Sequence, residues 1–338
     1  MRRVLVCMLL LLSACGTPSE NSQQTRQWMT PNGKIKVLST IGMINDLVKQ
    51  VGGEHVDSHV LIQGNLDPHS YQLVKGDGEK IAFADVIFYV GLGLEHGPGV
   101  QKQLHENAKA VSVGERIHEQ NPNSILVYNG TLDPHIWMDI SLWAKTVPTI
   151  VETLSRKDPE HAEEYRKNGD ALLQQLAEEH EQTRHFLQMI PAEKRYLVTS
   201  HDAFNYFAKA YLATDEEIQN NDWQKRFAAP EGLAPDSQLS SADIQLIIDH
   251  LSKYNIQVLF PESNLSRDSI AKIVDAGKEK GLNLYIASCA LYGDAMGRPG
   301  TDGDSYVKML RHNTRTIGKY LRDYNPRITC EEIGNEKY

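Results

Sequence analysis

The chain of 338 residues has only four cysteines, no block of basic residues and no apolar run long enough for a membrane-spanning helix. Its formal net charge is −9, and an acidic chain without a basic patch is a poor candidate for binding nucleic acid. It also lacks the His-Glu-x-x-His motif of zinc proteases. With 41% hydrophobic and 23% charged residues, the composition is that of a soluble globular protein of about two domains.

The N-terminus has the pattern of a secretory signal. A short basic region precedes the apolar run 4–12, which is too short to cross a bilayer as a helix. The sequence Leu12-Ser13-Ala14-Cys15 then resembles a bacterial lipobox, in which the cysteine becomes the lipidated first residue. We therefore predict a signal peptide at 1–14 and an exported protein anchored to the lipid bilayer of the bacterial cell envelope through Cys15. An ordinary signal with a coincidental cysteine is the alternative.

After removal of the signal, two cysteines remain besides the lipidated one. They are Cys289 and Cys330. Two cysteines in an exported domain suggest a disulfide, because such compartments are oxidising. Two unpaired thiols are the alternative, and the sequence does not exclude it.

The body of the chain alternates between strand and helix patterns. The segment 15–33 is polar, and beyond the lipid site we predict a flexible tether there. The segment 34–157 then predicts a first α/β lobe with a parallel sheet. Its expected strands are 35–40, 56–62, 86–90 and 110–113, and its expected helices are 41–51, 70–84 and 101–107.

The middle of the chain has little glycine and no strand signal. Asp158-Pro159-Glu160 is typical of a helix start, and we predict a linking helix over 158–190. Two helices of a bundle are the alternative. The segment 191–338 predicts a second lobe, so the predicted fold class is α/β, with two lobes of mainly parallel sheet joined by one long helix. The expected strands of this lobe are 196–200, 258–260 and 284–287, and the expected helices are 203–212, 241–254, 266–281 and 306–324.

Three of the thirteen histidines stand in related sequence contexts. His69 and His135 each end an Asp-Pro-His motif, and His201 follows the predicted strand 196–200. His69 and His201 thus leave the carboxyl ends of strands, where open α/β sheets bind ligands. Asp294, beyond the last predicted strand, is a fourth candidate.

These residue types suit a transition metal. Neutral imidazole is the commonest nitrogen ligand, and a carboxylate adds compensating charge. Proline fixes its own φ and favours an extended preceding residue, so an Asp-Pro-His motif holds its histidine in a defined direction. Asp67 and Asp133 are candidates to support the histidines from behind, and Glu262, beyond a predicted strand, is a third. Taken alone, a loop histidine is more often a surface or capping residue, Asp294 a turn residue, and Glu262 an ion-pairing or capping group.

The motifs together resemble the solute-binding lipoproteins of zinc and manganese ABC transporters, the cluster A-I or TroA/ZnuA family. The similarity runs from about residue 34 to 321, and the motifs stand in the order typical of the family. The matching stretches are 67–71, 84–86, 91–95, 133–139, 200–207, 230–233, 293–297 and 306–313.

The resemblance implies a metal in the cleft between two lobes, held by His69, His135, His201 and Asp294. It further implies a transported divalent metal, zinc, manganese or iron, and an ABC-type permease in the membrane as partner. In the family the third ligand is His in zinc-type and TroA-type members and Glu in typical manganese-type members. The segment 115–131 lacks the His-rich loop of many zinc-specific members. We expect a monomer that binds and releases metal without catalysis.

An exported zinc-dependent hydrolase is the alternative function. A catalytic metal needs an open coordination position, whereas four protein ligands would close the shell. The number of protein ligands therefore discriminates between the two functions. A third possibility, an adhesin, has no specific support in the sequence.

Overall fold

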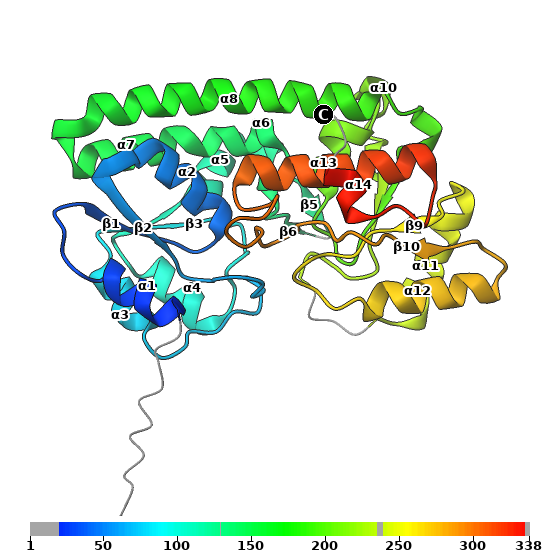
Figure 1. The fold of residues 1–338 in the computed structure, drawn as a ribbon, viewed down its shortest axis with the longest axis horizontal. Helices are drawn as coiled ribbons and strands as arrows, with labels where there is room; N and C mark the ends of the chain where they lie inside the picture. Colours follow the sequence, from blue (N-terminus) through cyan, green and yellow to red (C-terminus); the bar gives the residue numbers. More distant parts are fainter. Residues whose placement is uncertain (1–19, 129, 235–238, 335–338) are drawn as a thin grey trace, which may run out of the picture.

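The computed structural model of the protein describes residues 20–128, 130–234 and 239–334. Two α/β lobes stand side by side, and one long helix runs across both of them (Figure 1). The predicted signal peptide and Cys15 lie outside the described residues. Within the described part, no helix is both long enough and apolar enough to cross a membrane.

The first lobe is built on a parallel sheet in the order β2-β1-β3-β4. Alternate side chains of a strand point to opposite faces of a sheet. Val37 and Phe88 therefore join the core beneath α2, while Leu38 and Ile87 join a second core toward α3 and α4. Helices cover both faces, as a parallel sheet requires. The elements are β1 (Ile35–Ser39), α2 (Gly42–Gly52), β2 (Val56–Val60), α3 (Asp77–Phe83), β3 (Val86–Tyr89), α4 (Pro98–His105), β4 (Ala110–Ser112) and α5 (Val113–Gln120).

The helix predicted at 70–84 is shorter in the structure, where α3 covers only Asp77–Phe83. The carboxylate of Asp77 accepts hydrogen bonds from the Tyr71 hydroxyl (2.8 Å) and from the backbone N–H of Val74 (2.8 Å). These bonds hold the preceding residues out of the helix. The segment after His69 is therefore a loop, fixed by the first residue of α3.

The prediction of a flexible tether over 15–33 is wrong for the residues that the structure describes. Helix α1 (Glu20–Trp28) is present, and Trp28 is 3% exposed in the core toward α3 and α4. The Trp28 indole N–H donates to Asp57 O (2.9 Å), and the Asn32 amide donates to the Asp57 carboxylate (2.8 Å). One large aromatic side chain buries enough surface to dock an otherwise polar segment.

Helices occupy the middle of the chain. They are α6 (Ile140–Trp143), α7 (Val147–Lys157) and α8 (Ala162–Gln188), with a short 3-10 turn at Pro159–His161. The 27 residues of α8 span about 40 Å. Asn168 of α8 donates to Val51 O in the first lobe (3.1 Å), and Glu179 of α8 pairs with Arg311 in the second (2.6 Å). The long helix is thus attached to both lobes.

The second lobe has shorter strands. The parallel pairs are β7 (Leu197–Val198) with β8 (Phe227–Ala228) and β9 (Val258–Leu259) with β10 (Tyr285–Ile286). Phe260 N donates to Val198 O (2.8 Å), which places β9 beside β7. The helices of this lobe are α9 (Asn205–Phe207), α10 (Asp215–Gln219), α11 (Ser241–Lys253), α12 (Asp268–Glu279), α13 (Tyr306–Asp323) and α14 (Cys330–Gly334), and residues 208–212 form a π-helix after α9.

The second lobe also reaches back to the first. The chain after β10 runs toward the first lobe, and α13 begins beside α2 before returning (Figure 1). Tyr306 N donates to the Asp46 carboxylate (3.1 Å), and the Tyr306 hydroxyl donates to Trp137 O (2.7 Å). One cluster of buried apolar side chains includes residues of both lobes. A disulfide between Cys289 and Cys330 ties α14 to the second lobe.

Candidate metal centre

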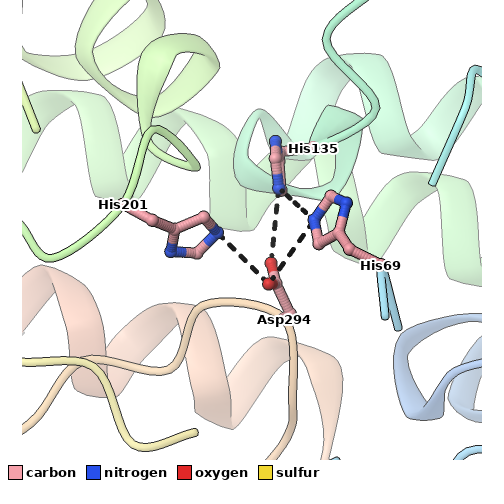
Figure 2. Close-up of side chains that lie close together, drawn as sticks. All are labelled: His69, His135, His201 and Asp294. Carbon is pink, nitrogen blue, oxygen red and sulfur yellow. Dashed lines mark hydrogen bonds and ion pairs between the residues drawn. The ribbon is translucent and has the colours of Figure 1, made fainter. Parts of the chain in front are cut away.

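Four buried side chains converge between the lobes (Figure 2). They are His69, His135, His201 and Asp294; none is more than 2% exposed, and one potential ligand atom from each lies within 4.8 Å of the others. The Nε2 atoms of His69 and His135 are 3.2 Å apart. Oxygens of the Asp294 carboxylate lie 3.7, 3.4 and 3.2 Å from the Nε2 atoms of the three histidines in chain order.

Each of these side chains comes from a loop. His69 follows β2, and His135 follows the hairpin of β5 (Val127–Tyr128) and β6 (Thr131–Leu132). His201 follows β7, and Asp294 lies between β10 and α13. Two candidate ligands therefore come from each lobe. Among the described residues, no other group of three or more His, Cys, Asp or Glu side chains has this geometry.

Asp133 holds His135 from behind. Its Oδ1 accepts a hydrogen bond from the backbone N–H of His135 (3.0 Å) and lies 2.8 Å from the ring Nδ1. Its Oδ2 accepts a bond from the Asn205 amide of the second lobe (3.1 Å). Because the carboxylate engages Nδ1, Nε2 is the nitrogen that faces the cluster.

Asp67 acts on the backbone of the first Asp-Pro-His motif. Its Oδ1 accepts a hydrogen bond from the backbone N–H of His69 (2.9 Å), and its Oδ2 accepts one from the Ser70 hydroxyl (2.6 Å). These bonds close an Asx turn that sets the direction of the loop. Both aspartates of the repeated motif thus accept the backbone N–H of their histidine, and Asp133 in addition engages the ring.

Glu262 holds His201. Its Oε1 accepts hydrogen bonds from the backbone N–H groups of Ser200 (3.1 Å) and His201 (2.9 Å), and its Oε2 lies 2.7 Å from His201 Nδ1. The close approach of this carboxylate depends on Gly293. A Cβ at that position would lie 2.3 Å from Glu262 Oε2, so only glycine leaves room for the carboxylate.

The loop that carries Asp294 is held from two directions. Asn313 of α13 accepts a hydrogen bond from Tyr292 N (2.9 Å) and donates one to Tyr292 O (2.8 Å). The Trp137 indole N–H donates to Gly293 O (3.1 Å). Since Trp137 belongs to the first lobe, that lobe helps to place the carboxylate of the second.

Burial and charge shift the pKa values in this cluster. Burial lowers the pKa of His69 to about 3, against the opposing charge of Asp294. Burial alone would lower the pKa of His201, but the carboxylates of Glu262 and Asp294 outweigh it and raise that pKa well above its ordinary value. Burial likewise favours neutral Asp294, but His201 and the other two histidines lower its pKa. The carboxylate therefore stays ionised, as a cation ligand must.

The unpaired polar atoms of the cluster fit a bound cation. His201 Nε2 and both carboxylate oxygens of Asp294 are buried without a hydrogen-bond partner. Such atoms are rare in folded proteins and call for an explanation, and an ion is one. Three imidazoles and a carboxylate form a donor set that suits Zn²⁺, and Mn²⁺ and Fe²⁺ accept the same ligand types.

The structure brings the four predicted ligand candidates together and places Asp133 and Glu262 behind two of them. Sequence reasoning missed three residues that hold the site, namely Asn205, Trp137 and Asn313. The available signal for Asn205 is a single amide inside the aromatic run 204–207. Trp137 and Asn313 stand in the family-like stretches 133–139 and 306–313, but nothing local indicates their partners, which are distant in the chain.

Comparison with known proteins finds relatives along most of the chain. The family described as ZnuA, zinc-uptake complex component A, periplasmic, matches residues 37–320. Metal-binding protein YtgA of Chlamydia muridarum is 36% identical, over 93% of this chain and 94% of the relative. Manganese-binding lipoprotein MntA of Bacillus subtilis is 35% identical, over 92% and 95%. Zinc-binding protein TroA of Treponema pallidum is 33% identical, over 85% and 88%.

Solved structures match the fold as well. Fe(III)-bound YtgA from Chlamydia trachomatis superposes with a TM-score of 0.80 at 38% identity, covering 85% of this chain and 98% of that one. The periplasmic zinc-binding protein TroA of Treponema pallidum gives 0.77 at 33% identity, covering 86% and 99%. The names of these relatives differ in the metal, which is zinc, manganese or iron(III).

Proposed function

The chain belongs to the ZnuA/TroA family of periplasmic metal-binding proteins, and on that premise we propose that it captures a divalent transition metal outside the cytoplasm and delivers it to the permease of an ABC importer. One observation carries the proposal. Three imidazoles and one carboxylate, two from each lobe, converge in a buried cluster with a potential ligand atom from each within 4.8 Å of the others.

The proposed ligands are the Nε2 atoms of His69, His135 and His201 and the carboxylate of Asp294. Four protein ligands complete the shell of a zinc ion, whereas a catalytic metal keeps a position open for water. The site is therefore suited to binding and release without catalysis. The hydrolase alternative is not supported, since the relatives are named as metal-binding or transport proteins.

We propose that Zn²⁺ binds most tightly in vitro and that Mn²⁺ or Fe²⁺ is also accepted. A nitrogen-rich site favours Zn²⁺ over Mn²⁺ and Fe²⁺ in the usual order of affinities. Availability in the cell can override that order, which accords with the different metals named for the relatives. Because the ligands come from both lobes, a bound metal should stabilise the closed arrangement. The shared core and α8 favour small motions over a wide opening.

Competitive titration of the metal-free protein with Zn²⁺ and Mn²⁺ tests this function. Wild type should bind both, with preference for Zn²⁺, and His69→Ala should weaken both. His105→Ala, at an exposed position of α4, is the matched control and should bind as wild type does. Elemental analysis of protein from native cells identifies the delivered metal. Unchanged binding by His69→Ala would overturn the ligand assignment, and a wild-type preference for Mn²⁺ would overturn the proposed order.

We further propose a lipid anchor on Cys15 and a monomeric mature protein. The proposed division is a first lobe at 34–157, a linking helix at 158–190 and a second lobe at 191–338. Cys15→Ala should abolish metabolic labelling with a radioactive fatty acid. Continued labelling of that variant would refute the anchor, and a dimer mass in light scattering of the mature domain would refute the monomer.

A further inference from the structure

A groove with a volume of about 1100 Å³ opens beside the metal centre. One wall is a single face of α2, because Gly42, Asn45, Asp46 and Lys49 follow the spacing of residues that share a helix face. The loop 294–299 forms the facing wall. Residues of α1, of β2 and of the loop 62–66 also line it, so the helix found in the predicted tether borders this groove.

The second lobe approaches this face of α2 at two points. A Cβ at Gly42 would lie 3.5 Å from the Met296 sulfur, and the Asp46 carboxylate accepts a hydrogen bond from Tyr306 N (3.1 Å). The loop that carries Asp294 therefore runs along this face of α2. The groove is a defined channel between an element of the first lobe and a loop of the second.

The groove reaches the metal centre at one ligand only. Asp294 belongs to its lining, whereas none of the three histidines does. Near the groove, Asn65 in the loop before His69 donates to Ser263 O and so links the two lobes (3.1 Å). Both carboxylate oxygens of Asp294 are themselves buried, so the groove ends against this residue, and a cation that moves inward from the groove would come to Asp294 before the imidazoles.

Besides Asp294, a second side chain of the groove, Asn45, points to a cation. It is 5% exposed, it lines the groove, and its Oδ1 has no hydrogen-bond partner. A buried amide oxygen without a donor is costly unless something else satisfies it. Amide oxygens are ligands for hard divalent cations and accept hydrogen bonds from their bound waters. Asn45 and Asp294 line the same groove, so the amide is available to an ion there without being one of the four candidate ligands.

From these observations we infer that the groove is the route by which the metal ion enters and leaves the centre, with Asn45 as a transient oxygen contact and Asp294 as the first ligand reached. The inference rests on the proposed function and specifies the path for the same site. Two of the groove carboxylates, Asp57 and Asp304, already pair with Lys36 and Lys308. The carboxylate of Asp46 accepts hydrogen bonds from Tyr306 N and Gln50. Lys49 and Arg298 are exposed cations of the lining that oppose an incoming cation, and removal of the Lys49 ammonium should speed binding.

Stopped-flow kinetics of Zn²⁺ binding and release separates a route from a binding site. A residue on the route changes the barrier, so association and dissociation slow by the same factor and the equilibrium constant stays constant. Asn45→Leu removes the oxygen at nearly constant volume and should slow both rates by roughly tenfold. Asn168→Leu makes the same substitution on α8, away from the groove, and should leave both rates unchanged. Wild-type rates for Asn45→Leu, or a slower association with unchanged dissociation, would overturn the route.

Lys49→Glu provides a test that does not disturb the core, because this side chain is exposed. Its association rate should exceed that of wild type by roughly threefold at low salt, and the excess should shrink as ionic strength rises. A rate equal to wild type at low salt would overturn the route. A wild-type protein that binds no Zn²⁺, Mn²⁺ or Fe²⁺ at all would instead overturn the proposed function.

Discussion

In the first lobe, the carboxylate behind His135 belongs to Asp133, two residues earlier; in the second, the carboxylate behind His201 belongs to Glu262, 61 residues later. The geometry is nearly the same in both lobes. Asp133 Oδ1 lies 2.8 Å from the ring Nδ1 and 3.0 Å from the backbone N of its histidine. The corresponding distances to oxygens of Glu262 are 2.7 and 2.9 Å.

The difference in sequence separation changes what each half of the site depends on. The Asp133 support forms within one loop, whose proline restricts the backbone. The Glu262 support forms only when β9 lies beside β7 and when residue 293 lacks a Cβ. The second lobe also has strands of two residues, against three to five in the sheet of the first. The second-lobe half of the site therefore relies more on tertiary packing.

The largest expected effect, a loss of Zn²⁺ affinity, is the same for a histidine of either lobe. His135→Ala and His201→Ala each remove one proposed ligand, so each should weaken Zn²⁺ binding by at least about a thousandfold, or about 4 kcal/mol. His201→Glu should instead shift preference toward Mn²⁺, because a carboxylate replaces the softer imidazole. Competitive titration of the purified variants measures both effects. A variant of either lobe that binds Zn²⁺ as wild type does would show that its histidine is not a ligand.

The disulfide should stabilise the second lobe in a way that the first lobe lacks. It closes a loop across 41 residues in the second lobe, whereas the segment 34–157 contains no cysteine. Replacing both Cys289 and Cys330 by Ser should lower the free energy of unfolding by about 3–4 kcal/mol in the chain-entropy model. Urea unfolding of the metal-free domain measures the change, with reduced wild type as the comparison. Equal midpoints for oxidised wild type and the double variant would contradict the prediction.

The two supporting carboxylates provide the sharpest comparison. Asp133→Asn and Glu262→Gln keep the size of each side chain but remove its charge, and each should weaken Zn²⁺ binding by roughly 10- to 100-fold. Glu262→Gln should have the larger effect, because its position depends on distant packing and not on a rigid local loop. Isothermal titration under identical buffer conditions measures the ratio. A larger loss for Asp133→Asn would reverse our interpretation of the two lobes.

The smallest expected effect concerns stability in acid, where each lobe has one histidine with a lowered pKa away from the candidate metal centre. Burial lowers the pKa of His59 in β2 to about 4 and that of His250 in α11 to about 4. In the unfolded chain these two histidines are protonated near pH 6.5, whereas in the folded protein they stay neutral until about pH 4. Their contribution to stability is therefore complete above pH 6.5 and is lost as the pH falls toward 4. Over this pH range each histidine should lower the free energy of unfolding by about 1 kcal/mol, after allowance for its partial exposure.

Replacing either histidine by Gln tests this pH dependence. The difference in unfolding free energy between pH 7 and pH 4.5 should be smaller for His59→Gln and for His250→Gln than for the wild-type, metal-free protein. The two variants should flatten the profile by similar amounts, since the pKa values are similar. A profile as steep as that of wild type would show that the chosen histidine does not titrate in this way.

Much of the fold was predictable because its signals are local. The strands expected at 35–40, 56–62, 86–90 and 110–113 correspond to β1, β2, β3 and β4, with ends that differ by one or two residues. Apolar runs reveal buried strands well. Helix α1 was missed because its composition is polar apart from Trp28, and the helix expected from residue 70 was cut short by the Asp77 hydrogen bonds. The short helix α5 and the β5–β6 hairpin were also missed.

By itself, the sequence determined that His69, His135 and His201 stand in loops after strands or beside prolines, and that their chemistry suits a transition metal. Those features depend on residues within a few positions of one another, where backbone sterics and hydrogen bonding act directly. Only the tertiary structure decided that Glu262 stands behind His201, that Gly293 makes room for it, and that Trp137 holds the Asp294 loop. Such contacts join distant parts of the chain, so packing of the whole fold sets their geometry.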